Sequence, residues 1–212
     1  STLSTPPAGD DTYASYNGYL YVVGGVAAGG AALSTVYFAP LTTSGVGTWR
    51  QTTSFPVARG YATALAYKGY MYLTSGCNNF TGGLCTSQSN EINDQEVAPI
   101  YANGQLGPWT KTSLLSEATG RVLAFMVGYN NYIYVGGGSN LSGGLNDYVY
   151  AQINSPGAVG NWTATTAGLT TGSMFAPAIA SGGYYYVVGG CTSFSGNVCS
   201  AVTNSVQYFA IN

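Results

Sequence analysis

Charge is the scarcest property of this 212-residue chain. Only 6% of its residues are Asp, Glu, Lys or Arg, against roughly a quarter in an average soluble protein. Five scattered basic residues and a formal net charge of −2 provide no positive patch that could bind nucleic-acid phosphates. The sequence therefore argues against a nucleic-acid partner. It predicts a surface whose polarity comes from Ser, Thr, Asn, Gln and Tyr.

Histidine is absent altogether, which removes the commonest general acid–base and metal-binding side chain. Seven carboxylates remain, and three of them fall in residues 91–96. Their oxygens could bind calcium, but the ligand order and turn glycine of an EF-hand are missing. A solvated acidic loop is the simpler interpretation, as an ordinary turn is for Asp10 and Asp11. We expect no enzymatic activity, no metal and no cofactor.

Long apolar runs and helical periodicity are also missing. No run approaches the roughly 18 residues that a membrane span needs, and no charged segment followed by an apolar one opens the sequence, as it would in a signal peptide. With 46% hydrophobic residues and 31 glycines, the chain alternates in the manner of strands. We expect one all-β domain over residues 1–212.

A short aromatic strand that ends at paired glycines occurs four times, with Ser75 replacing one glycine. The copies are residues 19–25, 70–76, 132–138 and 184–190. A strand and a tight turn such as Asn17-Gly18 precede the first copy, and further strands follow each one. Four-stranded units at this period are β-propeller blades, because each twisted sheet buries its faces against its neighbours. The predicted blade cores cover about residues 8–50, 59–110, 121–163 and 173–212.

The repeat resembles the Kelch repeat over essentially the whole chain. Paired glycines follow an aromatic strand, then come a Gly-x-Trp step, a Pro and an Arg before the next unit; Trp49, Pro56, Arg59 and Gly76 show the pattern best. The resemblance implies a Kelch-like β-propeller. Copper oxidases of this kind hold their metal partly through histidines, so the lack of histidine argues against that chemistry here.

The arginine of the repeat is present in two units, as Arg59 and Arg121, and replaced by Ala8 and Ser173 in the others. In Kelch-like propellers it points into the mouth of the central channel. Arg59 and Arg121 are therefore predicted to bind acidic groups of a partner through forked hydrogen bonds. The alternative, which is the simpler interpretation, is that they satisfy backbone carbonyls between blades.

Four cysteines form two matching pairs, Cys77 with Cys85 and Cys191 with Cys199. Their even number, close spacing and equivalent places in units two and four predict two local disulfides and an oxidising compartment. Zinc is a weak alternative, because the spacing is C-x7-C and no histidine could complete a mixed site.

The cysteine loops present Phe80 and Phe194, which are predicted to contact a partner or to pack locally. Three glycosylation sequons, at Asn79, Asn140 and Asn161, fit a secreted glycoprotein. The three tryptophans could stack on sugars, but their fixed place in the repeat favours packing between blades.

Residue 212 falls where the outer strand of the fourth unit should begin. We therefore expect the last blade to lack that strand, either within a longer propeller or with an open edge that recruits a neighbour. The leading functional hypothesis is a non-enzymatic extracellular or cell-surface module for adhesion or self-assembly into a layer or filament, with protein partners on its loops and open edge. The alternatives are a lectin-like propeller that binds a glycan and a fragment of a secreted propeller enzyme.

Overall fold

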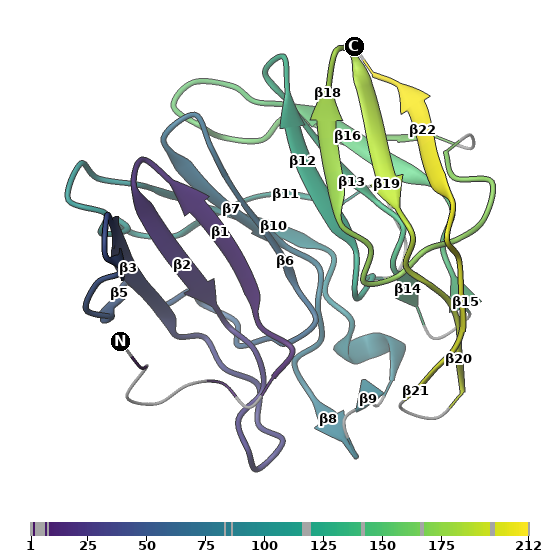
Figure 1. Cartoon of the computed structure of the whole chain (residues 1–212), viewed down its shortest axis with the longest axis horizontal. Coiled ribbons are helices and arrows are strands. Elements are labelled where there is room, and N and C mark those ends of the chain that lie inside the picture. Colours follow the sequence, from purple (N-terminus) through teal and green to yellow (C-terminus); the bar gives the residue numbers. More distant parts are fainter. Residues whose placement is uncertain are drawn as a thin grey trace.

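Four small antiparallel sheets make up the protein (Figure 1). The computed structural model describes residues 2, 7, 9–82, 84–85, 87–115, 120–140, 143–165, 168–195 and 198–211. The sheets follow one another along the chain as the blades of a β-propeller, which confirms the predicted all-β architecture. Within the described ranges, the one helical element is the 3-10 turn η1 (Gln88–Asn90), and no helix is long and apolar enough to span a membrane.

Each blade is a meander whose strands pair in chain order. Blade 1 contains β1 (Thr12–Tyr16), β2 (Tyr19–Val23), β3 (Val36–Thr42) and β5 (Arg50–Thr52), with the short β4 (Gly45–Val46) on the end of β3. Blade 2 contains β6 (Thr63–Tyr67), β7 (Tyr70–Thr74), β10 (Asp94–Pro99) and β11 (Thr110–Leu114). Blade 3 contains β12 (Phe125–Tyr129), β13 (Tyr132–Gly136), β16 (Tyr148–Gln152) and β17 (Thr163–Thr165). Blade 4 contains β18 (Ala178–Ser181), β19 (Tyr184–Val188) and β22 (Val206–Ala210), so the described part of this blade has three strands, as predicted.

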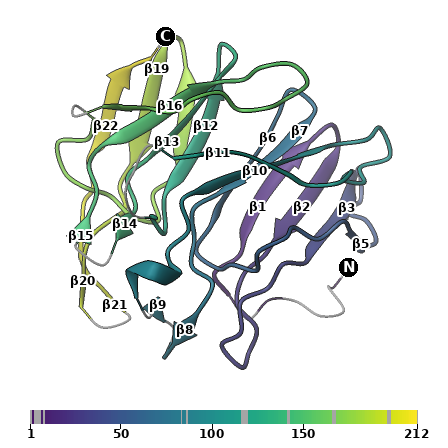
Figure 2. The ribbon, with the colours of Figure 1, turned by 180° about the vertical axis from the view of Figure 1, so that it is seen from behind.

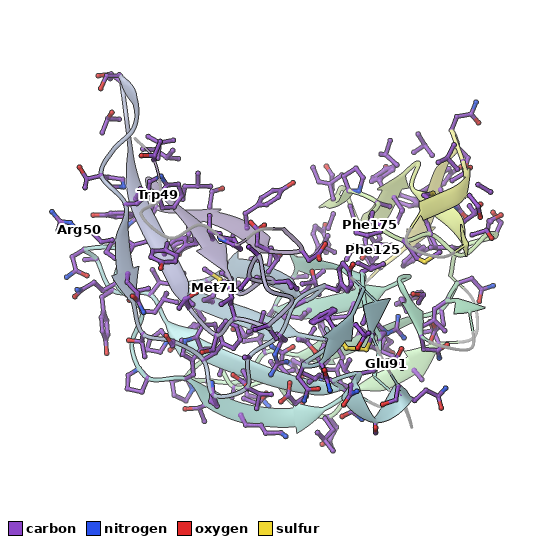
Figure 3. The ribbon with its side chains drawn as sticks, turned by 90° about the horizontal axis from the view of Figure 1, so that it is seen from below. Trp49, Arg50, Met71, Glu91, Phe125 and Phe175 are labelled. Atoms are coloured by element: carbon purple, nitrogen blue, oxygen red, sulfur yellow. A yellow bond between two sulfur atoms is a disulfide. The ribbon has the colours of Figure 1, made fainter. Side chains whose placement is uncertain are left out.

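The first strands of the blades lie side by side. β1 contacts β6, β6 contacts β12 and β12 contacts β18, so these four strands are the innermost ones. Seen from below, the blades form an arc that leaves a gap between blade 1 and blade 4 (Figure 3). The two end blades therefore each have one sheet face without a neighbouring blade.

Strand alternation gives every blade two faces. We call the face that carries the tyrosines of the Tyr-x-Tyr pattern the B face, and the opposite one the A face. In blade 2, Tyr70 and Tyr72 lie on the B face, whereas Met71 and Leu73 lie on the A face. The B face of blade 1 packs on the A face of blade 2, blade 2 packs on blade 3 in the same way, and blade 3 packs on blade 4. The main core thus consists of three layers between blades.

The paired glycines join neighbouring blades. Both residues of each pair have positive φ, between 57° and 105°, and Ser75 adopts the same conformation with φ 64°. In blades 1 to 3 the second residue of the pair donates its N–H to a carbonyl of the following blade: Gly25 to Arg59, Gly76 to Arg121 and Gly138 to Ser173. Glycine suits this joint because it adopts a left-handed conformation without steric cost.

The loops that follow the paired glycines contain hairpins that the sequence did not predict. They are β8 (Phe80–Thr81) with β9 (Leu84–Cys85), β14 (Ser139–Asn140) with β15 (Gly143–Gly144), and β20 (Cys191–Ser195) with β21 (Val198–Val202). All three lie at the same end of the propeller, as the view from behind also shows (Figure 2). Both predicted disulfides are confirmed there, Cys77–Cys85 and Cys191–Cys199.

Candidate functional site

Four equivalent residues line the propeller axis, one just before the innermost strand of each blade. Asp10, Tyr61, Leu123 and Phe175 all have positive φ, between 55° and 59°. A relay of backbone hydrogen bonds connects them, because the N–H of Tyr61 donates to the carbonyl of Asp10, that of Leu123 to Tyr61, and that of Phe175 to Leu123. Left-handed backbone is uncommon for such side chains, and a rigid frame that imposes it is typical of functional sites.

A cleft of about 410 Å³ lies beside this relay, within the size range of small-molecule sites. Asp11, Tyr13, Phe125 and Phe175 are among its lining residues, and Figure 3 labels the two phenylalanines. A smaller hollow of about 100 Å³ adjoins it and adds Asp10 and Tyr61, among others, to the lining. The site thus combines aromatic rings with two carboxylates.

Burial sets the electrostatics of this cleft. Desolvation raises the pKa of Asp10, an effect that the hydrogen bond from the Tyr61 hydroxyl opposes and the neighbouring Asp11 charge reinforces. Burial, together with the Asp10 charge, raises the pKa of Tyr61 to about 12. Tyr61 is therefore a protonated hydrogen-bond donor at neutral pH, and its ring packs edge-on against Phe80 and Phe175.

Arg59 does not reach the mouth of the channel, contrary to the partner-binding role that we predicted. Its side chain is fully buried, with Nη1 2.6 Å from Asp94 Oδ1 and Nη2 3.0 Å from Glu96 Oε1. Nη1 also donates to the carbonyl of Ser75, and Nε donates to that of Val57. The arginine thus satisfies backbone carbonyls, as the alternative proposed, and also forms a buried ion cluster that the sequence did not predict.

Arg121 repeats this arrangement in blade 3. It is also fully buried, its Nη1 donates to the carbonyl of Gly137, and its Nη2 lies 3.1 Å from Asp147 Oδ2. Ser173 takes over part of the role in blade 4, because its hydroxyl donates to the equivalent carbonyl, that of Gly189. The residue at this position of the repeat therefore stabilises the joint beside the paired glycines in blades 2, 3 and 4. In blade 4, where no acidic side chain faces this position, a positive charge is unnecessary.

The acidic segment 91–96 is neither a solvated loop nor a metal site in this structure. Glu91, Asp94 and Glu96 are buried, and the last two belong to β10 and hold Arg59. No group of three or more acidic or cysteine side chains within the described ranges could hold a metal ion. The prediction of a solvated loop failed because Arg59, the partner of Asp94 and Glu96, lies 35 and 37 residues away from them in the sequence.

Glu96 gives the protein a testable pH dependence. Burial raises the pKa of its carboxyl above the ordinary value, although Arg59 opposes this. The folded protein therefore binds this proton more readily than the unfolded chain, so acidification from neutral pH through the raised pKa should stabilise the fold, and the gain is complete below the unfolded pKa of about 4.3.

Glu96→Gln should abolish this gain. Urea unfolding at pH 7 and pH 4.5 should show that the wild type becomes more stable relative to the variant at the lower pH. Asp11→Asn serves as a control that leaves Glu96 in place. An equal stability difference between wild type and Glu96→Gln at both pH values would contradict the assignment.

The remaining predicted site residues are distributed over the loops. Phe80 is buried and packs against Tyr61, so it packs locally and presents no ring to a partner; the side chain of Phe194 lies outside the described residues. Asn79 and Asn161 are exposed and Asn140 is half-buried, and the rest of the Asn140 sequon lies outside the described residues.

Two of the three tryptophans lie between blades, whereas Trp49 of blade 1 is half-buried. Trp109 of blade 2 donates its indole N–H to the carbonyl of Thr53 and packs edge-on against Phe55, both in the segment that follows blade 1. Trp162 is buried in the layer between blades 2 and 3. Both positions confirm packing between blades over stacking on a sugar.

Comparison with known proteins identifies the fold. No family model matches the sequence, and no curated protein matches it. The solved structure of YjhT superimposes with a TM-score of 0.68 at 17% sequence identity, covering 98% of this chain and 64% of that one. The chain therefore spans less than two thirds of the YjhT structure. At this level of identity the similarity shows a shared β-propeller fold alone.

Proposed function

We propose that this protein is a non-enzymatic, extracellular propeller module of the Kelch type that acts in adhesion or self-assembly at a cell surface. The observation that carries the proposal is the near absence of charge from its surface. The chain has five basic and seven acidic residues, and five of these twelve are buried: Arg59, Glu91, Asp94, Glu96 and Arg121.

Such a surface favours contact with copies of itself or with other neutral surfaces. Like charges repel approaching molecules, and charged groups are costly to desolvate in an interface. The exposed large apolar side chains include Tyr13, Ile179, Val202 and Tyr208, each more than half exposed. Two disulfides brace the loops, as is usual in oxidising compartments, and these support the extracellular assignment.

Sedimentation velocity over a range of protein and salt concentrations tests this function. We expect concentration-dependent association that changes less than about twofold between roughly 0.05 and 1 M salt, because few exposed charges are available for screening. Adsorption to uncharged hydrophilic beads would measure adhesion separately. A protein that stays monomeric at all concentrations and does not adsorb would contradict the proposal.

A lectin-like function is the second candidate, and the axial cleft favours it. Sugars present C–H faces that stack on aromatic rings and hydroxyls that donate to carboxylates, and Phe175 and Asp11 offer both groups within the cleft. The cysteine loop at Phe80 offers less for glycan binding, since Phe80 is buried.

A glycan array tests this candidate. We expect Phe175→Ala, at a side chain 54% exposed, to lose binding at least about tenfold, since one aromatic stacking contact contributes about 0.5–1.5 kcal/mol beyond the area it buries. Tyr101→Ala is the control, since Tyr101 is 50% exposed and is not among the cleft residues. An array without hits would overturn the lectin candidate.

A further inference from the structure

The B face of blade 4 is an apolar sheet face that no other blade covers. Cross-strand pairing places eight side chains on it, from Ile179 and Ser181 on β18 to three residues on each of β19 and β22. Ile179 is 59% exposed, Val206 56% and Tyr208 64%. The face consists of Ile179, Ser181, Tyr184, Tyr186, Val188, Val206, Tyr208 and Ala210.

The equivalent faces of blades 1 to 3 are all covered by a neighbouring blade. In each of them the Tyr-x-Tyr side chains pack on the A face of the following blade. Tyr21 and Tyr72, the equivalents of Tyr186, are completely buried. The same face occurs four times in this chain, and three of the four copies have the same kind of occupant.

Blades 2 and 3, which cover the B faces of blades 1 and 2, each carry a glycine in the turn that follows their third strand. The Tyr19 ring of blade 1 lies 2.5 Å from the position that a Cβ on Gly104 of blade 2 would occupy. The Tyr70 ring of blade 2 lies similarly close to the Cβ position of Gly157 in blade 3. These turns admit a tyrosine ring because glycine has no side chain. Tyr184 is the equivalent ring on blade 4 and is 41% exposed.

Blade 1 of the same chain offers the matching surface. The turn that follows its third strand, β3, is one residue shorter than the equivalent turns of blades 2 and 3. It carries Gly45, which has φ 108°, and no atom lies within 4 Å of a Cβ placed on this glycine. On its A face the innermost strand carries Ser15, at the position that Ala66 and Gly128 occupy in blades 2 and 3. Leu20 and Val22, on the neighbouring strand of this face, are half-buried. Tyr13, on the same face, is 74% exposed.

We propose that the B face of blade 4 binds the A face of blade 1 of a second copy of this chain, with Tyr184 seated on the turn at Gly45. The inference rests on the proposed self-assembly and specifies its contact surface. Because the two faces differ, the contact is head-to-tail, and it produces chains of molecules unless a rotation closes them into a ring. The open gap of the arc is then the place where neighbouring copies meet.

Two arginine substitutions test the contact. Ile179→Arg places a charge on the B face of blade 4, and Tyr13→Arg places one on the A face of blade 1; both sites are more than half exposed, so the fold should tolerate them. Each variant alone should associate at least about 100-fold more weakly, because an unpaired charge in an apolar interface costs several kcal/mol. Mixed together, the two variants should form 1:1 dimers that grow no further, since each supplies the intact face that the other lacks.

The matched control is Val202→Arg, at a residue 77% exposed on β21 and outside both faces, which should associate like the wild type. Association by Tyr13→Arg but not by Ile179→Arg would replace this contact with a symmetric one between two B faces. Unchanged association by both variants would overturn the contact and leave self-assembly standing. A wild type that stays monomeric would overturn it as well, and the face would then be left for a blade of another polypeptide.

Discussion

Arg59→Leu is expected to lower the free energy of unfolding by about 3–5 kcal/mol, the usual cost of removing one partner from a buried ion pair. The variant leaves the carboxylates of Asp94 and Glu96 buried without their principal cation. Lys111 offsets only part of the loss: its Nζ lies 3.6 Å from Asp94 Oδ2, but its side chain is 57% exposed, so water screens the pair. Urea denaturation at neutral pH, with the fluorescence of the three tryptophans as the signal, measures the change.

Two matched variants make this expectation specific. Arg121→Leu should cost less, because its partner Asp147 is 29% exposed and water can solvate the abandoned carboxylate. Arg50→Leu should change stability by no more than about 0.5 kcal/mol, since Arg50 is exposed. Equal losses for all three arginines would refute the importance of the buried cluster.

Gly137→Ala is expected to be the most damaging small substitution, with a loss of about 3 kcal/mol or more from left-handed strain and overpacking together. A Cβ at this position would lie 2.3 Å from a ring carbon of Phe125 and 2.6 Å from the carbonyl oxygen of Ser173, and φ is 57°. Neither neighbour can move freely, because Phe125 is buried between blades 3 and 4. Thermal and urea unfolding should both show the loss.

Gly30→Ala separates the two causes. Gly30 has a similar left-handed conformation, φ 84°, but nothing lies within 4 Å of a Cβ placed there. This variant should therefore lose only the backbone cost of about 1–2 kcal/mol. If Gly137→Ala were no more harmful than Gly30→Ala, the joint between blades would be looser than the structure indicates.

The fold could be predicted because its signals are local. The Tyr-x-Tyr strands, the turns such as Asn17-Gly18 and the paired glycines each specify a strand or its end within a few residues, and four repetitions remove the ambiguity of any single copy. The disulfides could be predicted for the same reason, since the cysteines of each pair are only eight positions apart in the sequence.

The candidate site could not be predicted because its parts are distant in sequence. Arg59 lies in the segment before β6 and Asp94 in β10, 35 residues further along the chain. A periodic pattern nevertheless connects the two positions. Asp94 and Asp147 occur opposite the glycine pair only in the two blades that have an arginine, whereas Thr35 and Ser205 stand there in the others. The left-handed residues along the axis could not be predicted for another reason, since Tyr61 and Phe175 are not among the residue types that usually adopt this backbone conformation.

The relay around the axis connects blades through main-chain atoms alone, so the identity of each side chain there is open to change. Asp, Tyr, Leu and Phe already occupy the four equivalent places, and none of them contributes its side chain to the backbone hydrogen bonds. Divergence at these places alters the chemistry of the inner wall without rebuilding the scaffold. Repeats descended from one ancestor can in this way acquire different specificities one position at a time.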